Sequence, residues 1–387
     1  NEPGRENWEG FETAPKAAAA GGITMLVDMP LNSSPVTIDA DSFYKKITAA
    51  KGKLYVACGF YGGIVPGNED KIEELIKCGV LGFKAFMIHS GIEDFPDVNE
   101  ADLRKALDVL KRSGSKLPLL VHAELNIGKT ISGKPDTKSY SGFLESRPRE
   151  MENKAIRLLI DLSREYDYHI HIVHLSSSDA IGIIKKAKAE GVKITVETCP
   201  HYLFFSSENI DDNDTRFKCT PPIRENENRE KLWEAVEDGL IDLIVSDHSP
   251  CDPDLKFIEE GDCEKAWGGV SSLQLGLSVV WTEAVKRKIS IEKISKLMSS
   301  NTSAFIGMNQ SKGKIENGFD ADLVIFDPTE KFTVEKNLLY HKHRVTPYIG
   351  CELTGKVIAT YLNGEKIFEN GKIINSPTGK IILKKSL

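Results

Sequence analysis

The chain has 387 residues, of which 40% are hydrophobic and 28% charged, and its formal net charge is −7 at pH 7. This length and composition can bury a large core, and they favour two domains or one barrel with an appended unit. The acidic balance argues against nucleic acid as a partner, and no run approaches the roughly 18 consecutive apolar residues that a membrane span needs.

Short apolar runs with the composition of strands alternate with helical patterns along most of the chain. Such alternation is typical of a parallel sheet that helices bury on both faces. The number of units favours a (β/α)8 TIM-type barrel over a doubly wound sheet, with the first strand missing from the count. The runs cover residues 21–30, 54–63, 82–88, 117–124, 169–177, 192–200 and 240–250.

A different pattern begins after Asn309. Residues 313–327 and 355–373 consist of short runs of alternating polarity with Asn-Gly turns, which indicates antiparallel strands. We therefore expect a barrel domain over residues 1–309 and a small β-sandwich portion over residues 310–387.

Polar side chains lie late in several of the apolar runs. Lys84, His122, His174 and Asp247 all occupy such positions. Because a (β/α)8 barrel carries its chemistry at the carboxyl ends of its strands, we expect these four groups to share one site. A single buried histidine is more often a satisfied core residue, but two imidazoles and a carboxylate together suit a hydrolytic zinc-like centre.

Lys84 is the unusual member of this set, because an ammonium group repels cations. Burial inside a barrel lowers the pKa of a lysine, and the neutral amine can then capture carbon dioxide as a carbamate that bridges two metals. The alternative is an interior lysine held by a salt bridge. Spacing alone does not separate the two.

Several stretches resemble the motifs of the allantoinase family within the cyclic amidohydrolases. They are "NEPGRENWEGF", "AAAAGGITMLVDMPLNSSPVT", "GFKAFMIHSGIEDFP", "ETCPHY", "KCTPPIR" and "SDHSPC", and together they cover almost the whole chain. The resemblance implies a barrel with a small β-sandwich built from both chain ends. It also implies the hydrolysis of allantoin to allantoate, and an assembly of four identical chains.

The resemblance further implies two divalent metal ions, zinc first and otherwise cobalt, manganese or iron. In the family a carbamylated lysine bridges the two ions, which matches Lys84. His122 and His174 correspond to ligands of one ion, and Asp247 corresponds to a ligand of the other and to the general base.

In the family, a D-x-H-x-H-L motif on the first barrel strand directly precedes the residues that match Asn1 onward. Its two histidines ligate the same ion as the residue that corresponds to Asp247. The residues of this motif are absent from this sequence. We therefore expect a chain shortened at its start, which by itself is inactive and prone to aggregate because an unpaired strand edge is left in the barrel.

Other positions are candidates for substrate binding. Asn32, His89, Thr220 and His201 match or neighbour positions that hold the substrate in relatives, and for His201 a role in structuring its loop is an equal alternative. Arg5 and Arg224 could bind a carboxylate or ureido group, although anchoring of loops is the commoner fate of such residues. For His169 and His171, packing of a strand face against helices is the favoured interpretation.

Two sister activities fit less well. Dihydropyrimidinases place a tyrosine shortly after the bridging lysine, where this chain has His89, and dihydroorotases carry a histidine where it has Cys251. A non-catalytic scaffold with the same fold is the alternative from another class, and the retained ligand set argues against it. The seven scattered cysteines predict free thiols and favour an intracellular compartment, without deciding between cytoplasm, peroxisome and mitochondrion.

Overall fold

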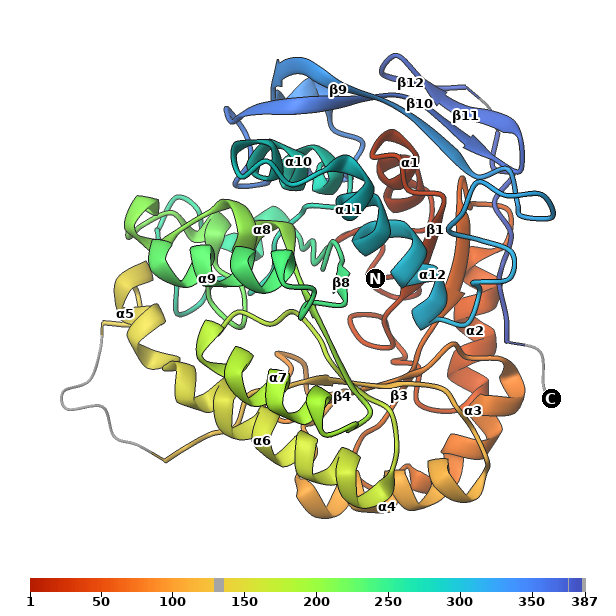
Figure 1. Cartoon of the computed structure of the whole chain (residues 1–387), viewed down its shortest axis with the longest axis vertical. Coiled ribbons are helices and arrows are strands. Elements are labelled where there is room, and N and C mark those ends of the chain that lie inside the picture. The colour runs from red at the N-terminus through yellow and green to blue at the C-terminus, as the bar shows by residue number, and fades with distance from the viewer. Residues whose placement is uncertain (129–135, 375, 385–387) are drawn as a thin grey trace.

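The computed structural model of the chain describes residues 1–128, 136–374 and 376–384. Helices surround a set of short parallel strands, and an antiparallel sheet lies across one end of the molecule (Figure 1). The parallel strands are β1 (Met25–Asp28), β2 (Ala57–Phe60), β3 (Gly62–Gly63), β4 (Phe83–Phe86), β5 (Leu119–His122), β6 (Ile170–Ile172), β7 (Ile194–Thr198) and β8 (Leu243–Ile244).

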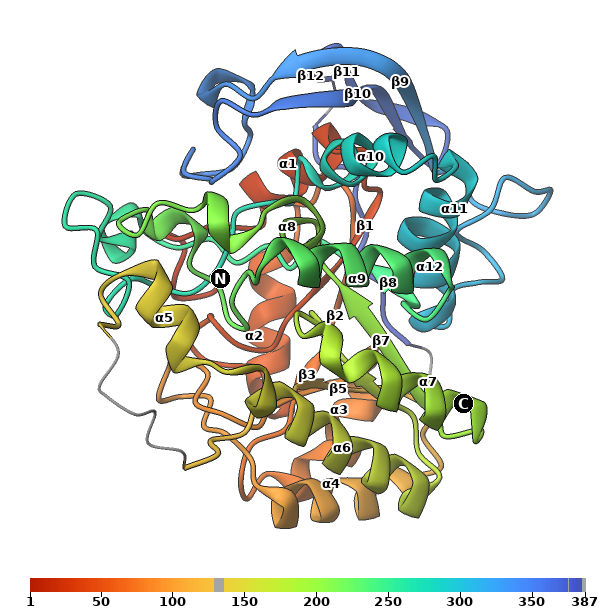
Figure 2. The ribbon, with the colours of Figure 1, turned by 60° about the vertical axis from the view of Figure 1, so that its left-hand side comes forward.

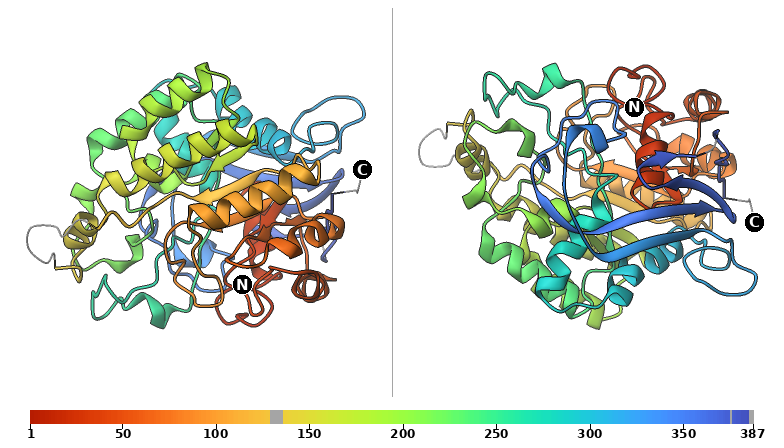
Figure 3. Two further views of the ribbon diagram at one scale, coloured as in Figure 1. Left: turned by 90° about the horizontal axis from the view of Figure 1, so that it is seen from below. Right: turned by 90° about the horizontal axis from the view of Figure 1, so that it is seen from above.

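Helix α1 (Thr13–Ala20) precedes β1, and the other helices lie between or after the strands along the chain. These others are α2 (Ala40–Ala50), α3 (Ile72–Cys78), α4 (Glu100–Arg112), α5 (Tyr140–Ser146), α6 (Arg149–Tyr166), α7 (Ile181–Ala189), α8 (Pro200–Phe204), α9 (Asn226–Glu237), α10 (Gly276–Lys286), α11 (Ile291–Ser295) and α12 (Asn301–Phe305). Seen from below, the helices coloured orange to green form an arc around the strands (Figure 3, left).

The strands pair in parallel and in chain order. β1 pairs with β2, and β3 to β8 form one sheet in which each strand neighbours the next along the sequence. Parallel neighbours joined by crossover helices are the arrangement that the alternating pattern predicts. The expected (β/α)8 barrel is therefore confirmed. Among the described residues, β1 pairs only with β2, and β8 only with β7.

Helix α4 illustrates why these segments become helical. The side chain of Asn99 accepts a hydrogen bond from the Asp102 backbone N–H, and the Asp102 carboxylate accepts one from the Asn99 backbone N–H, so the two residues form a reciprocal cap. Leu103, Leu107 and Leu110 recur at helical spacing and are fully buried. The cap fixes where the helix begins, and the apolar stripe fixes which face packs on the sheet.

The pairing register decides which side chains point into the barrel. Lys84 of β4 lies opposite Leu120 of β5, which lies opposite His171 of β6, which lies opposite Thr195 of β7. Paired residues share a face of the sheet, so these four point the same way. Leu120 belongs to an inner apolar cluster with Tyr61 of the segment joining β2 and β3, whereas the alternate residues of β5 and β6 belong to the large cluster under the helices.

His169 and His171 both pack against Phe305 at the end of α12, with ring centroids 5.8 and 4.3 Å away. This agrees with the interpretation of a strand face covered by a helix. The face is the inner one, however, because His171 also contacts Glu197 of β7 at 2.9 Å and the Thr195 hydroxyl at 2.7 Å. The alternating positions of a strand predict that the two residues share a face but not which face it is.

The antiparallel sheet consists of β9 (Leu323–Thr333), β10 (Glu352–Leu362), β11 (Glu365–Glu369) and β12 (Lys372–Ile373), in the order β12-β11-β10-β9. One face of this sheet lies over α1 and α10 (Figure 2; Figure 3, right). The Thr360 hydroxyl donates a hydrogen bond to the Ala19 carbonyl of α1 at 2.7 Å, and the Trp281 indole N–H of α10 donates one to the Pro328 carbonyl at 2.9 Å.

Gly355 allows β10 to approach α10 closely. Its φ is +93°, and a Cβ atom there would lie 2.3 Å from the ring of Phe326 and 2.4 Å from that of Trp281. The chain then returns to the barrel, where the Cys58 N–H of β2 donates a hydrogen bond to the Lys380 carbonyl at 2.9 Å. All seven cysteines are free thiols, as expected. None of the described helices combines the length and apolarity needed to cross a membrane.

Candidate metal centre

The carboxyl ends of β4, β5 and β6 bring Lys84, His122 and His174 together inside the barrel. All three side chains are buried. The Lys84 amine lies 4.5 Å from the ring centre of Phe86, and the His122 ring stacks on that same phenyl ring at 4.7 Å. The rings of His122 and His174 meet edge to face at 4.6 Å. Three of the four expected ligands therefore converge, as the sequence predicts.

Lys84 lacks the salt bridge that was the alternative to a carbamate. Its Nζ atom is fully buried and has no hydrogen-bond partner among the described residues. Burial lowers the pKa of Lys84 to about 7, although the nearby Asp247 and Glu197 carboxylates oppose this shift. A large fraction of this amine is therefore neutral at physiological pH, which is the form that reacts with carbon dioxide.

His122 is held by residues that the sequence did not single out. Its Nε2 atom lies 2.7 Å from Oε2 of Glu124, and the Arg147 guanidinium donates a hydrogen bond to the same oxygen at 2.8 Å. Burial would raise the pKa of Glu124, but Arg147 and His122 together hold it at about 2, so the carboxylate is ionised. A carboxylate that fixes an imidazole ring is the usual support of a histidine ligand.

We expect Glu124→Gln to lower zinc affinity by roughly ten- to a hundredfold, because the neutral amide holds the His122 ring less firmly. Competition with a chromophoric chelator measures the change. Glu145→Gln on the exposed side of α5 makes the same chemical change away from the site and is the matched control. Equal zinc affinity in the two variants would remove Glu124 from this role.

His174 and Asp247 share an unusual backbone conformation. Each lies a few residues beyond the end of its strand, and their φ angles are +41° and +42°. Left-handed backbone at a non-glycine residue costs of order 1–3 kcal/mol and persists where the surrounding structure holds it, often at functional sites. In both cases the turn ends the strand pleat and re-aims the side chain.

The electrostatics of Asp247 tie it to the same site. Burial is the largest cause that raises its pKa, to about 7, and the neighbouring Glu197 carboxylate adds to the shift while Lys84 opposes it. The pKa of His174 lies well below its usual range, chiefly through burial and then through His122 and Lys84. Each of the four expected groups is therefore within electrostatic range of at least one of the others.

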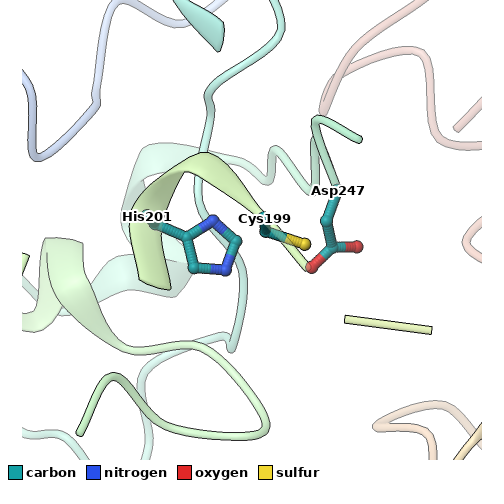
Figure 4. A group of neighbouring side chains, drawn as sticks. All are labelled: Cys199, His201 and Asp247. Carbon is teal, nitrogen blue, oxygen red and sulfur yellow. The ribbon is translucent and has the colours of Figure 1, made fainter. Parts of the chain in front are cut away.

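A further group of possible ligands includes Asp247 and two residues of the turn from β7 into α8. The Cys199 sulfur, a ring nitrogen of His201 and a carboxylate oxygen of Asp247 all lie within 4.8 Å of one another (Figure 4). His201 is fully buried, neither ring nitrogen has a described partner, and burial lowers its pKa to about 3. The sequence singled out His201 but not Cys199 or Glu197, although the alternation along "ITVETCP" places Thr195 and Glu197 on one face.

The remaining substrate-binding candidates lie at different depths. Asn32 is half-buried beyond β1 with an unpartnered Oδ1 atom, and Thr220 is half-buried against Gly268. His89 lies on an exposed loop, where its Nε2 atom is 3.4 Å from the Glu93 carboxylate. The structure therefore places His89 on the surface and does not group it with the buried donors.

The two arginine candidates also differ. Both guanidinium Nη atoms of Arg224 donate hydrogen bonds to the Arg147 carbonyl at 3.2 Å, so this residue anchors a loop, which was the commoner fate expected. Arg5 packs over the ring of Trp8 at 4.9 Å, and its buried Nη1 atom has no described partner.

The donor groups fit a divalent cation. Unpartnered buried nitrogens on Lys84 and His174, a supported imidazole on His122 and a carboxylate on Asp247 supply the N and O atoms that zinc-like ions prefer. An unpartnered buried polar atom is costly and calls for an occupant. The barrel and these groups define a hydrolase of the (β/α)8-barrel class.

The chain belongs to the amidohydrolase family, whose model matches residues 2–367. Within this family it groups with allantoinases. It is 46% identical to probable allantoinase 2 of Dictyostelium discoideum over 100% of this chain and 80% of that protein. It is 44% identical to the allantoinase of Arabidopsis thaliana, over 99% of this chain and 78% of that protein, and 41% identical to the allantoinase of Saccharomyces cerevisiae, over 99% and 83%. The expected resemblance is thus confirmed.

Solved structures with a similar fold include a hydantoinase and a dihydropyrimidinase. L-hydantoinase (dihydropyrimidinase) from Arthrobacter aurescens has a TM-score of 0.91 and 29% identity, covering 99% of this chain and 86% of that chain. Dihydropyrimidinase from Brevibacillus agri NCHU1002 has a TM-score of 0.88 and 26% identity, covering 97% and 83%. The fold agrees with the barrel and appended sheet seen here.

Proposed function

We propose that this protein hydrolyses the ring amide of allantoin to give allantoate. The observation that carries the reaction type is the buried, unpartnered amine of Lys84 beside the rings of His122 and His174 at the carboxyl ends of neighbouring strands. The substrate follows from similarity, because identity to the three allantoinases named above is 41–46%, against 29% for the L-hydantoinase structure.

Two divalent ions, with zinc as the first candidate, are part of this proposal. Lys84, His122 and His174 would hold one ion, and Asp247 with the shared Lys84 would contribute to the other. When bound, the ions supply Lewis acidity and lower the pKa of water towards neutrality. The unpartnered nitrogen of His174 and the Glu124 support of His122 favour this assignment.

Lys84 would act as a carbamate. The neutral amine adds to the carbon of carbon dioxide: a new N–C bond forms as one C=O π bond opens and places its electron pair on oxygen, and the nitrogen releases one proton to solvent. The product is an anion whose two oxygens can each accept a positive partner. Its negative charge removes the repulsion that an ammonium group would exert on cations, and the pKa of about 7 supports a supply of neutral amine.

Asp247 would move the proton of the reaction. As water attacks the ring amide carbon, the carboxylate accepts one of its protons, and it returns that proton to the ring nitrogen as the C–N bond breaks. One residue thus serves as base and then as acid. Its backbone has a φ of +42°, and its carboxylate acts electrostatically on the Lys84 amine.

Asn32, Thr220 and His201 are proposed to bind the ring amide and ureido groups of the substrate. Each offers a hydrogen-bonding group near the strand ends, and Asn32 and His201 have unpartnered buried atoms available. An assembly of four copies is part of the same proposal and rests on family resemblance alone.

The test compares ring opening of allantoin, hydantoin, dihydrouracil and dihydroorotate by the purified full-length protein loaded with zinc. The highest kcat/KM is expected for allantoin, and removal of metal with a chelator should abolish the activity until zinc is restored. Preference for hydantoin or dihydrouracil would assign the protein to the activity of its structural neighbours instead. Activity that survives complete metal removal would contradict the metal-dependent mechanism.

A further inference from the structure

The group of Cys199, His201 and Asp247 has the composition of a metal site of its own. A sulfur, an imidazole nitrogen and a carboxylate oxygen lie within 4.8 Å of one another, and Figure 4 shows the sulfur between the ring and the carboxylate. Cys199 and His201 flank Pro200 at the start of α8, so one rigid turn presents both donors. Neither side chain is exposed.

His201 supplies the second, independent observation. It is fully buried, and neither of its ring nitrogens has a partner among the described residues. Buried polar atoms without partners are rare in folded proteins, and each calls for a ligand or water. Because no hydrogen bond joins the His201 ring to the Cys199 sulfur, the pair also lacks the contact that a cysteine nucleophile needs with its base.

The chemistry of the three donors selects the ion. Thiolate and imidazole prefer soft or borderline cations such as Cd²⁺ and Zn²⁺, whereas hard cations such as Mg²⁺ and Ca²⁺ require oxygen ligands. A site with three protein ligands leaves a position open for water. Coordination replaces the S–H proton of Cys199 with the metal, and that proton leaves to solvent.

We propose that Cys199, His201 and Asp247 form an inhibitory binding site for thiophilic divalent cations, filled by cadmium or by excess zinc. Asp247 is the shared element, because an ion held between it and Cys199 withdraws the carboxylate from the proton transfer assigned to it. The inhibitory consequence rests on the proposed function, whereas the binding itself does not. The protein would thus lose activity when soft cations are abundant.

The binding is tested by adding cadmium to the purified, zinc-loaded protein and recording the thiolate-to-cadmium charge-transfer absorbance. The N and O donors of the main centre give no such band, so the signal reports sulfur ligation whether or not the protein turns over allantoin. The cadmium titration is expected to show a high-affinity step, called here the tight component. Cys199→Ala is expected to remove it and to weaken cadmium binding by roughly a hundredfold, because a ligand itself is lost.

Cys58→Ala is the matched control, since Cys58 is an equally buried thiol on β2. It should keep the tight cadmium component. His201→Asn should weaken the component without abolishing the band, because the sulfur remains. An unchanged absorbance titration in Cys199→Ala would overturn the site.

The inhibition is measured with allantoin, each variant being compared with its own rate without cadmium. Low cadmium concentrations should inhibit the natural protein and Cys58→Ala, and Cys199→Ala should need roughly a hundredfold more. Cadmium bound through Cys199 without any loss of rate would overturn the inhibitory role. If the protein has no allantoinase activity, the proposed function is wrong. The absorbance titration still tests the cation site in that case.

Discussion

Replacement of Asp247 by asparagine is expected to lower kcat for allantoin by roughly a hundred- to ten-thousandfold, while metal stays bound. Asparagine keeps the size of the side chain and an oxygen that can face a cation, but its amide cannot accept and return a proton. The loss should appear in kcat rather than in KM, because the proton transfer belongs to the transition state.

Metal content must be measured on the same samples, because Asp247 is also a proposed ligand. Asp252→Asn makes the same chemical change in the following loop, where the Asp252 carboxylate caps a short helix, and it should retain most of the activity. Near-normal turnover in Asp247→Asn with full metal occupancy would show that another group moves the proton.

Lys84→Ala is expected to lose both metal ions and essentially all activity. The substitution removes the group proposed to become the bridging carbamate. Activity should fall at least as far as in Asp247→Asn, because the ions that supply Lewis acidity are lost with the lysine.

Rescue separates this chemical role from a structural one. A short carboxylic acid, with zinc in excess, can enter the cavity left by the lysine side chain and supply the missing oxygens, so it should restore part of the metal content and part of the rate. Lys46→Ala is the control, because Lys46 is equally buried but bound to Asp28 at 2.7 Å, and the acid should restore nothing there. A free amine at Lys84 in electron density of a fully active, metal-loaded protein would refute the bridge.

The sequence was sufficient to predict the strands and the convergence of Lys84, His122 and His174, for a physical reason. Parallel strands buried on both faces are continuously apolar, because burying a polar side chain without a partner destabilises the folded state. A polar residue late in such a run is therefore expected at the end of the strand. Lys84 and His122 satisfy this rule directly, since they share the inward face with Leu120 and Phe86 through the register.

Side-chain direction beyond a strand could not be predicted in the same way. His171 points inward, so strict alternation would turn His174 outward, towards the helices. Its backbone at φ +41° breaks the alternation and brings its ring to 4.6 Å from that of His122. The local sequence does not predict this turn, because the strained backbone conformation is stabilised by the residues packed around it.

Supporting residues were missed for a related reason. Glu124 follows His122 by two positions, yet its role depends on Arg147, which lies on a different segment of the chain. Cys199 resembles any other buried cysteine until the turn into α8 places its sulfur beside Asp247. Contacts between distant segments carry no signal in a single sequence, whereas strand ends do.

The strictly sequential parallel pairing of β3 to β8 also governs how the site comes into existence. Parallel strands can pair only after the crossover between them has folded back, so the contacts that build the barrel are non-local and form slowly. On the ribosome, Lys84 emerges well before Asp247, and a lone donor on an unfinished sheet cannot retain an ion. Any ion held by the proposed centre is therefore expected to bind late, once the parallel strands have paired.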